Sequence, residues 1–321
     1  MLNDDITLVS VLCLSYNHEQ YIEQTIKSFL MQKTTFNYEI IIHDDRSNDL
    51  SQKVIKKYEQ MYPNRITAIL QKENQYSKGI SIIDDIMIPL AKGKYIALCE
   101  GDDYWTDENK LQKQVEMLEN NINCDVCAHA VNIFDMKKQK IIGTINSCKE
   151  KKIFSLQEVV DGGGNFVGTN SLMIRKSYWN NLFEARKIYP LDYILQITSS
   201  ISGGMAFVPE VMSVYRFGTC GSWTDRIRKN PASFAIHYKR LNEAILSLDN
   251  ETNERFHDIL YNEICYTKYM QLRLERRYKD LINADNKDIW NSVSKKDKIV
   301  LYLKYYLPFI DKFLDWRRNG K

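Results

Sequence analysis

The chain has 321 residues, of which 44% are hydrophobic and 26% are charged. These fractions are those of an ordinary globular protein, so a disordered chain is excluded, and the length suffices for one large core with a smaller appendage. The net charge of +3 hides an asymmetry, because residues 226–321 hold 20 Lys+Arg against 13 Asp+Glu. No basic stripe interleaves with aromatic residues in residues 1–225, so a nucleic-acid-binding protein is not expected.

The first half of the chain alternates strand-like and helix-like segments. Apolar runs predict strands at Leu8–Leu14, Tyr38–His43, Ile66–Leu70 and Lys94–Cys99, and helices are predicted at His18–Met31, Leu50–Tyr62 and Ile80–Ala91. Asn17 is expected to cap the first helix, with Gln20 at the spacing of a capping box. Units of this length predict an α/β fold with a parallel sheet flanked by helices.

The rest of the chain predicts a change of architecture near residue 225. A helix is expected at Leu111–Asn120, followed by strands and loops to about Trp223. From there on, Phe234–Leu248 and Glu254–Ile282 have helical spacing and few turn formers. We therefore predict one α/β domain over residues 1–225 and a helical C-terminal region over residues 226–321.

The cysteines and the hydropathy pattern indicate a reducing, cytoplasmic location. Seven cysteines lie mostly inside apolar runs, so they are interpreted as small buried hydrophobes. Cys124-x-x-Cys127 falls in a predicted strand, Asp125–Phe134, without a second pair at ligand spacing, which argues against a zinc site. Neither a membrane-spanning stretch nor a signal peptide is expected from the sequence.

Polar clusters follow three of the predicted strands, at Ser15–Asn17, Asp44-Asp45 and Glu100–Asp103. Ligands of open parallel sheets bind at the carboxyl ends of the strands, so we expect these clusters to form a site. Three carboxylates within four residues repel one another unless a cation lies among them, and oxygen ligands suit Mg²⁺ or Mn²⁺. A capped turn before the helix at Leu111 is the alternative interpretation.

Asp44-Asp45 has two functional interpretations and one structural alternative. The pair could bind a second metal, or accept hydrogen bonds from a nucleotide base and ribose. The alternative is a helix N-cap, although Ser47 or Asn48 could serve that purpose without the aspartates.

At this point the sequence resembles a known family. The segments that carry the resemblance are VLCLSYNHEQYIEQTIKSFLMQ, EIIIHDDRSND, GKYIALCEGDDYWTDENKLQKQ, GTNSLMIRKSYW, PLDYILQ and EVMSVYRFGTCGSW, in this order. Together they closely resemble glycosyltransferase family 2, whose members are inverting enzymes with the GT-A fold. The resemblance covers about the first 225 residues. Each motif alone is only moderately specific, whereas their order is strongly specific.

The resemblance implies a role for each matched position. It implies a metal-dependent hexosyltransferase that uses Mn²⁺ or Mg²⁺, a nucleotide-diphosphate sugar (a UDP-sugar by default) and a glycan or polyprenyl-diphosphate-linked acceptor in bacterial surface polysaccharide or glycoconjugate synthesis. The implied donor-nucleotide residues are Ser15, Tyr16, Asn17, Glu19, Asp44, Asp45, Glu100, Gly101 and Asp102. Asp102 and Asp103 would hold the metal, with Glu100-Gly101-Asp102 as the DxD-type motif, and Asp192 would be the general base. The implied acceptor and loop residues are Thr169, Asn170, Tyr215, Arg216 and Trp223.

The sequence departs from the family pattern at three positions. Glu100 begins the DxD-type motif in place of Asp, and Leu191 precedes the implied base where the family often has Glu. Glu210 is a weaker candidate for the base. Arg46 replaces the usual Gly after the aspartate pair, and His43 before the pair is interpreted as a buried structural histidine.

Two functional alternatives are less consistent with the sequence. A nucleotidyltransferase would carry a Gly-rich, basic loop after the first strand, where this chain has SYNHEQ. A binding module without catalysis would not need to retain Asp102, Asp103 and Asp192. The Q-x-x-R-W motif and the spanning helices of processive synthases are absent from the sequence, so transfer of a single sugar is expected.

The C-terminal segment Ile299–Trp316 is rich in aromatic residues and has basic flanks. Two interpretations have equal weight. The segment could be an interfacial helix on the inner face of a membrane, or it could pack on the transferase domain or in a homodimer.

Overall fold

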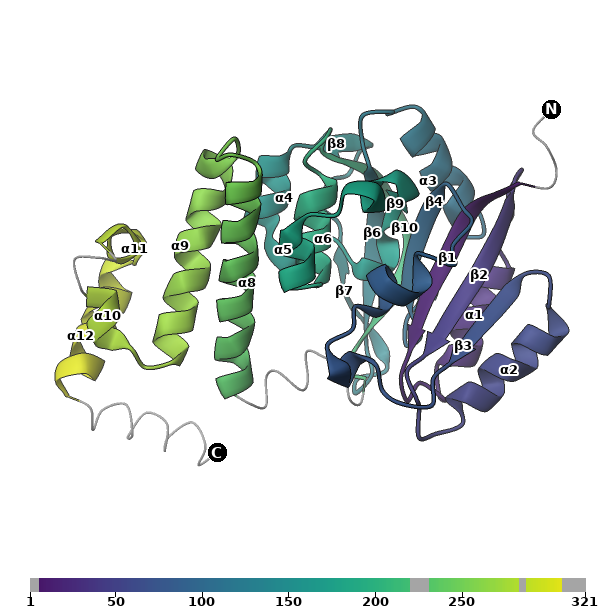
Figure 1. The fold of residues 1–321 in the computed structure, drawn as a ribbon, viewed down its shortest axis with the longest axis horizontal. Coiled ribbons are helices and arrows are strands. Elements are labelled where there is room, and N and C mark those ends of the chain that lie inside the picture. The colour runs from purple at the N-terminus through teal and green to yellow at the C-terminus, as the bar shows by residue number, and fades with distance from the viewer. Residues whose placement is uncertain (1–5, 220–230, 283–286, 308–321) are drawn as a thin grey trace. The chain divides into compact units, whose positions relative to one another are not determined.

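A computed structural model describes residues 6–219, 231–282 and 287–307 (Figure 1). The chain divides into two compact units, Met1–Ser222 and Trp223–Lys321. This division lies in the segment 220–230, which is outside the described residues, as is the boundary that the sequence predicts after residue 225.

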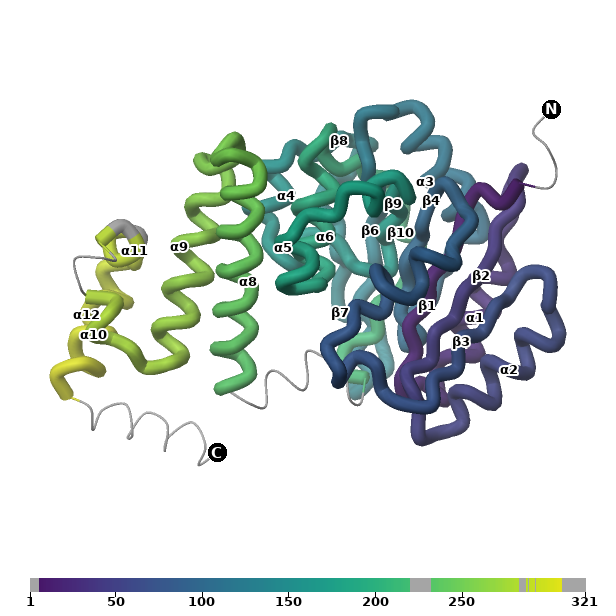
Figure 2. Tube along the Cα trace, in the orientation of Figure 1, coloured from purple at the N-terminus to yellow at the C-terminus, as the bar shows by residue number. Residues whose placement is uncertain are grey.

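The first unit is built on one ten-stranded sheet with the order β3-β2-β1-β4-β9-β6-β10-β5, in which β7 pairs with β6 and β8 with β10. Parallel pairing joins β1 to β2 and β4, β2 to β3, and β6 to β10. Figure 2 shows β1 and β4 side by side although β2 and β3 lie between them in the sequence. The strands are β1 (Thr7–Ser15), β2 (Asn37–Asp44), β3 (Ile66–Leu70), β4 (Tyr95–Glu100), β5 (Tyr104–Trp105), β6 (Val126–Asp135), β7 (Lys140–Ile145), β8 (Lys152–Phe154), β9 (Met173–Arg175) and β10 (Met205–Phe217).

Two apolar cores cover the two faces of this sheet. One core packs α1, α2 and α3 against the sheet, and the other packs a π-helix, α4 and α6 against the opposite face. Side chains of β1 alternate between them, because Val11 and Cys13 face the first core and Leu12 faces the second. The helices are α1 (Ile22–Leu30), α2 (Ser51–Met61), the π-helix (Ile82–Met87), α3 (Lys110–Glu119), α4 (Leu156–Gly162), α5 (Glu184–Ile188) and α6 (Asp192–Ser199). The predicted α/β class is confirmed.

The register of the parallel strands brings three carboxyl ends to one edge of the sheet. Ser15 at the end of β1 lies opposite Asp44 in β2. On the other side of β1, Leu14 lies opposite Glu100 in β4. The polar clusters that follow these strands therefore share one edge, as the sequence predicts.

The first helix begins later than predicted. It starts at Ile22, and its N-cap residue, Tyr21, makes no side-chain capping hydrogen bond. Asn17 was the predicted cap, but it has φ 59° and its Oδ1 accepts a hydrogen bond from the Asn48 N–H, 2.8 Å away. The predicted capping box is wrong because Asn17 binds a loop that is distant in sequence.

The connection between β3 and β4 also differs from its prediction. A helix is predicted over Ile80–Ala91, whereas the structure has a short π-helix in which the Ile88 N–H donates to the Ile83 carbonyl, 2.9 Å away. Such i to i+5 geometry is rare in proteins. Here the central residue, Asp84, is buried in an ion pair with Arg186.

The second unit is helical, as predicted. The segment predicted as one helix over Glu254–Ile282 is divided into α9 and α10, since Arg276 between them has φ 59°. A small core joins the unit through Leu272, Tyr278, Leu281, Val293 and Leu301. Its described helices are α8 (Pro231–Glu251), α9 (His257–Leu274), α10 (Tyr278–Ile282), α11 (Lys287–Ser292) and α12 (Lys295–Tyr306).

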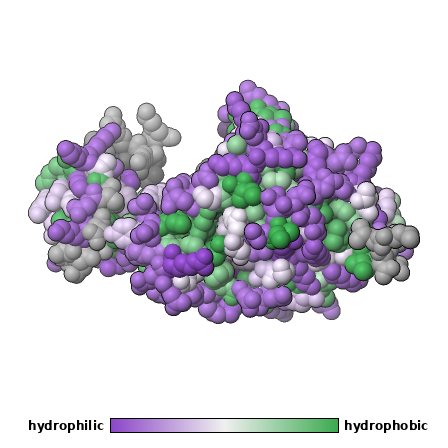
Figure 3. Space-filling model, turned by 90° about the horizontal axis from the view of Figure 1, so that it is seen from above, coloured by the Kyte–Doolittle hydropathy of each residue, from purple (hydrophilic) through white to green (hydrophobic). Residues whose placement is uncertain are grey.

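No helix within the described ranges combines the length and the apolar character that a membrane crossing requires. On the face drawn in Figure 3, the surface is mostly hydrophilic and its hydrophobic residues form small separate groups.

Candidate active site

Asp44, at the end of β2, is fully buried, and both of its carboxylate oxygens accept hydrogen bonds from other residues of the chain. Oδ1 accepts hydrogen bonds from the Ser47 N–H and the Gln52 amide, both at 2.8 Å. Oδ2 accepts from the hydroxyls of Ser47 and Ser15 at 2.6 and 3.2 Å. Asp44 therefore ties the end of β1 to the β2–α2 loop.

Asp45 fixes a second loop, the segment after β3. Its Oδ1 accepts from the Gln75 N–H at 2.7 Å, and its Oδ2 accepts from the Tyr76 N–H at 3.1 Å. The Asn74 amide donates to the Asp45 carbonyl at 3.1 Å. A nucleotide that binds this carboxylate must share it with the loop or displace the loop.

The loop after β1 is attached to the loop after β2 by two of the predicted site residues. Asn17 accepts from the Asn48 N–H, and Glu19 Oε2 accepts from the Leu50 N–H at 2.8 Å, at the start of α2. Tyr16, between the strand and these contacts, is 40% exposed. The side chain of Tyr16 is thus accessible to a ligand.

Asp102 lies in the turn after β4 and keeps one carboxylate oxygen available. Its Oδ2 accepts from the Thr219 hydroxyl at 2.8 Å and lies 3.9 Å from His18 Nε2. Oδ1 has no hydrogen bond to a described residue. Burial lowers the pKa of His18, against the opposing effect of Asp102, which favours a neutral imidazole beside this carboxylate.

Asp103 is turned inward and only 1% exposed. Its Oδ2 accepts from the Asn170 amide and its Oδ1 from the Arg216 N–H, both at 2.9 Å. Burial, followed by the carboxylates of Asp102 and Glu100, raises the pKa of Asp103 well above its usual value. Asp103 is buried with both oxygens engaged, whereas Asp102 keeps one oxygen available, so Asp102 is the better placed of the two predicted metal ligands.

Arg216, on β10, holds the backbone of the Asp102 turn through its buried guanidinium group. Its Nη1 donates to the Asp102 carbonyl, and its Nη2 donates to Gln24 Oε1 at 2.6 Å. The guanidinium also lies over the rings of Tyr21 and Tyr104, 5.0 and 4.5 Å from their centroids. This buried position indicates that Arg216 shapes the turn, whereas the sequence assigns it to an acceptor loop.

Asn170 is likewise buried, where the sequence predicts an acceptor contact. Besides binding Asp103, its amide donates to the Val214 carbonyl at 3.1 Å, and its Oδ1 accepts from the Ser213 hydroxyl at 3.0 Å. Tyr215, between these strand residues and Arg216, is half-buried. Trp223, the last predicted site residue, lies outside the described residues.

Glu100 and Asp192 are electrostatically coupled across the site. Partial desolvation by the surrounding protein, followed by the carboxylates of Asp102 and Asp192, raises the pKa of Glu100 above its usual value. Glu100 is itself exposed to solvent, so water screens part of this interaction. Its carboxylate has no hydrogen bond within the described part of the chain, which leaves it available to a ligand.

Asp192 is the first residue of α6 and is half-buried. The Thr169 hydroxyl donates to its Oδ2 at 2.5 Å, and the Tyr193 N–H binds its Oδ1 at 3.0 Å. Arg186 Nη1 donates to the carbonyl of the preceding Leu191 at 2.7 Å. Asp192 is therefore held in place from both sides, as a proton-accepting group requires.

Comparison with known proteins decides the family. The model of glycosyl transferase family 2 matches residues 10–182, more than half of the chain. The chain belongs to glycosyltransferase family 2. A protein of Mycobacterium tuberculosis is 34% identical over 224 residues, which are 68% of this chain and 62% of that protein. The match thus spans about three fifths of the length of that relative.

Another relative is a UDP-Glc:α-D-GlcNAc-diphosphoundecaprenol β-1,3-glucosyltransferase, WfaP, from Escherichia coli. It is 38% identical over 112 residues, which are 35% of this chain and 41% of WfaP.

Solved structures confirm the GT-A fold. Residues 1–349 of Staphylococcus aureus TarS in complex with UDP-GlcNAc give a TM-score of 0.56 at 14% identity, covering 88% of this chain and 78% of that TarS fragment. The mannosyltransferase PcManGT of Pyrobaculum calidifontis, with GDP-Man and Mn²⁺, gives 0.53 at 13% identity, covering 98% and 86%. The predicted GT-A fold is thus confirmed.

The carboxylate oxygens available in this family 2 chain fit a metal ion that also binds substrate phosphates and water. Within residues 6–219, 231–282 and 287–307, no three His, Cys, Asp or Glu side chains form a metal cluster. Glu100 and Asp102 Oδ1 are the available carboxylate oxygens. Mg²⁺ and related ions bind through one or two carboxylates together with substrate phosphates and water, so two such oxygens are sufficient.

Sequence reasoning missed three residues that contact the candidate site. Thr219 and His18 contact Asp102, and Arg186 holds the backbone before Asp192. Thr219 and His18 lie in segments that resemble the family, so the resemblance could have identified them. Arg186 lies outside those segments, and only the three-dimensional structure identifies it.

The turn after β4 requires glycine at position 101. A Cβ there would lie 2.8 Å from His18 Nδ1, 3.0 Å from the Leu14 carbonyl oxygen and 3.1 Å from Ile22 Cδ1. We expect Gly101→Ala to lower the free energy of unfolding by about 1–3 kcal/mol, as overpacking does. Urea denaturation measures the change, with Gly143→Ala as control, where a Cβ meets nothing closer than 4.0 Å. Equal stability of the two variants would contradict the expected close contact.

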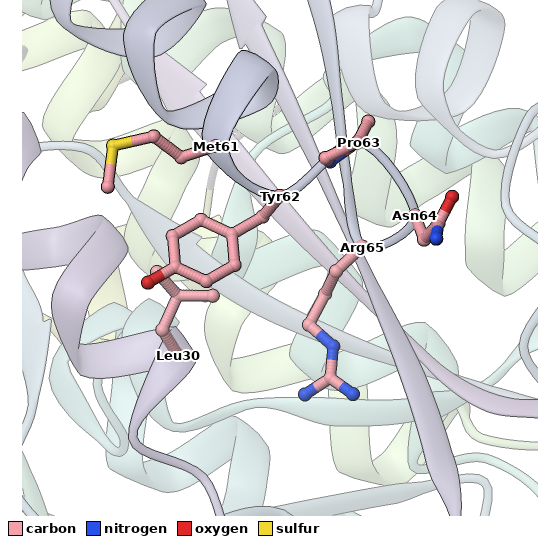
Figure 4. Close-up of a pocket in the computed structure, with 6 residues that line it drawn as sticks. All are labelled: Leu30, Met61, Tyr62, Pro63, Asn64 and Arg65. Carbon is pink, nitrogen blue, oxygen red and sulfur yellow. The ribbon is translucent and has the colours of Figure 1, made fainter.

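A separate pocket lies away from this site, next to the start of β3. It has a volume of about 430 Å³ and is lined by Leu30, Met61, Tyr62, Pro63, Asn64 and Arg65 (Figure 4). Leu30 and Met61 are the last residues of α1 and α2, and the other lining residues connect α2 to β3, at the sheet edge opposite the strand ends of the candidate site. None of the predicted site residues lines this pocket.

Proposed function

We propose that this chain is an inverting, metal-dependent glycosyltransferase that moves one hexose from a nucleotide-diphosphate sugar to a hydroxyl of an acceptor glycan. The observation that carries the proposal is the pairing of Glu100 and Asp102 at a strand end with Asp192 on α6. The first two can bind a metal and a diphosphate, and the third can accept a proton. The UDP-GlcNAc complex of TarS supports a UDP-sugar as donor.

In this proposal each step of the transfer is assigned to a named group. Asp192 accepts the proton of the acceptor hydroxyl while that oxygen forms a bond to the anomeric carbon. The bond from this carbon to the diphosphate breaks, and its electron pair leaves with the diphosphate. Attack from the opposite side inverts the anomeric centre, so no enzyme nucleophile is needed. When bound at Asp102 and Glu100, Mn²⁺ or Mg²⁺ supplies charge neutralisation for the leaving group.

Three buried residues have supporting roles in this proposal. Asp103 and Arg216 hold the Asp102 turn and are assigned to positioning. Asp44 has the same role for the β2–α2 loop, whereas Tyr16 and Asp45 are proposed to border the nucleotide.

The acceptor is proposed to be a glycan on a polyprenyl diphosphate, in bacterial surface polysaccharide or glycoconjugate synthesis. The name of WfaP, which specifies a diphosphoundecaprenol acceptor, supports this class. A cytoplasmic location, with peripheral contact to the inner face of the membrane, follows from such an acceptor. We expect a single addition, and a polymeric product from purified protein and donor would contradict it.

The first test is thermal stabilisation by UDP, GDP, dTDP and CMP, with and without Mn²⁺. Ligand at about 100 times its dissociation constant should stabilise the fold by about 2.7 kcal/mol. We expect one nucleotide diphosphate to act in the presence of Mn²⁺ and this shift to be lost in Asp102→Asn. Asp161→Asn, an exposed position on α4, is the control. Absence of a shift with every nucleotide would count against donor binding.

A further inference from the structure

Helix α12 presents an apolar face to solvent. Ile299, Tyr302, Leu303 and Tyr306 are 62, 40, 43 and 68% exposed. At about 100° per residue, positions i, i+3, i+4 and i+7 fall on one side of a helix. A surface helix of a globular protein normally turns such a stripe inward, so this arrangement is the reverse of the usual one.

The orientation of α12 is fixed by its other side. Leu301 is 2% exposed and packs with Leu272, Tyr278 and Leu281 in the core of the second unit. The Ser294 hydroxyl caps the helix by accepting from the Asp297 N–H at 3.1 Å. The helix is therefore anchored, and its apolar stripe faces outward because the opposite side is already packed.

The charges near the stripe are positive. Lys295 and Lys296 are exposed and begin the same side of the helix. The one acid of α12, Asp297, lies on the packed side and is engaged at the helix N-terminus, where its carboxylate accepts from Ser294. The exposed side thus combines apolar and aromatic groups with two lysines and no carboxylate, which suits a partner that is apolar and anionic.

We propose that the exposed side of α12 binds an anionic lipid surface. Aliphatic side chains would enter the boundary between headgroups and acyl chains, and the Tyr302 and Tyr306 rings would lie at headgroup depth. Lys295 and Lys296 would contact lipid phosphates. A second copy of this chain could cover the apolar stripe, but the same face offers no negative charge to the two lysines. This inference does not depend on the proposed sugar transfer, because it uses residues of the second unit alone.

The test is co-sedimentation of the full chain with vesicles of phosphatidylcholine or of equimolar phosphatidylcholine and phosphatidylglycerol. We expect binding to the anionic vesicles that weakens as salt is added. Ile299→Ser/Leu303→Ser/Tyr306→Ser should abolish it. Lys295→Gln/Lys296→Gln should weaken it by about fivefold per lysine, the equivalent of about 1 kcal/mol each.

Ile236→Ser, at a position on α8 that is 58% exposed, is the matched control and should leave vesicle binding unchanged. All substituted positions are exposed, so circular dichroism should show an unaltered fold. Failure of the wild-type chain to bind anionic vesicles, or equal binding by the triple variant, would overturn the proposal. A wild-type dimer that the triple variant converts to monomers, without vesicle binding by either, would assign this face to a second copy instead.

Discussion

Asp192→Asn is expected to lower the rate of sugar transfer by about 10²–10⁴-fold, the usual contribution of a general base. The amide cannot accept the acceptor proton, whereas its oxygen can still accept the Thr169 hydrogen bond, so the position of the side chain should be retained. Asp192 stands at the start of α6 and not among the strand-end carboxylates, so nucleotide binding should be unchanged. Initial rates with saturating donor, combined with nucleotide titration by thermal shift, separate the two effects.

Glu210→Gln is the matched control for this prediction, since sequence reasoning leaves Glu210 as the weaker candidate for the base. Glu210 is exposed on β10, and we expect the variant to keep the wild-type rate. A normal rate in Asp192→Asn together with a large loss in Glu210→Gln would reverse the assignment. A loss of nucleotide binding in Asp192→Asn would indicate that Asp192 belongs to the donor site.

The position of the site could be predicted from the sequence because it follows from local patterns. Apolar runs ended by polar clusters identify strands and their carboxyl ends, and parallel pairing then brings Ser15, Asp44 and Glu100 to one edge. These inferences need only hydrophobic periodicity and the geometry of parallel sheets.

The roles of individual carboxylates could not be predicted in the same way. Asp102 and Asp103 are neighbours with the same chemistry, but only Asp103 is saturated by Asn170 and Arg216. Those partners lie 67 and 113 residues further along the chain, so sequence spacing carries no information on them. The same reason explains the wrong cap at Asn17, whose side chain binds Asn48, 31 residues away.

The buried ion pair between Arg186 and Asp84, which lies next to the backbone before Asp192, should be sensitive to the loss of one partner. The side chains of Arg186 and Asp84 are 2 and 5% exposed, with Nε and Oδ2 3.1 Å apart. Asp84 also accepts from the Trp179 indole at 2.8 Å and the Ser81 hydroxyl at 2.6 Å. Removing one partner leaves an uncompensated buried charge, so Arg186→Met should lower the free energy of unfolding by about 3–5 kcal/mol.

Urea denaturation of single and double variants tests this pair. Arg186→Met/Asp84→Leu should recover a large part of the loss, because well-packed apolar groups can replace a buried pair. Lys187→Met is the neighbouring control, since Lys187 pairs with Glu184 at an exposed position, where such pairs contribute about 0–1 kcal/mol. Similar losses in Arg186→Met and Lys187→Met would contradict the buried-pair account.

The ion pair should also affect catalysis through the backbone. Arg186 donates to the Leu191 carbonyl, one residue before Asp192, so the double apolar variant regains packing but not this hydrogen bond. We therefore expect it to fold and to bind nucleotide, with a reduced kcat per folded molecule and an unchanged KM for the donor. A normal kcat in the stable double variant would limit Arg186 to a role in folding. A reduced kcat would mean that Arg186, which is paired with Asp84 of the β3–β4 connection, helps to position the base on α6.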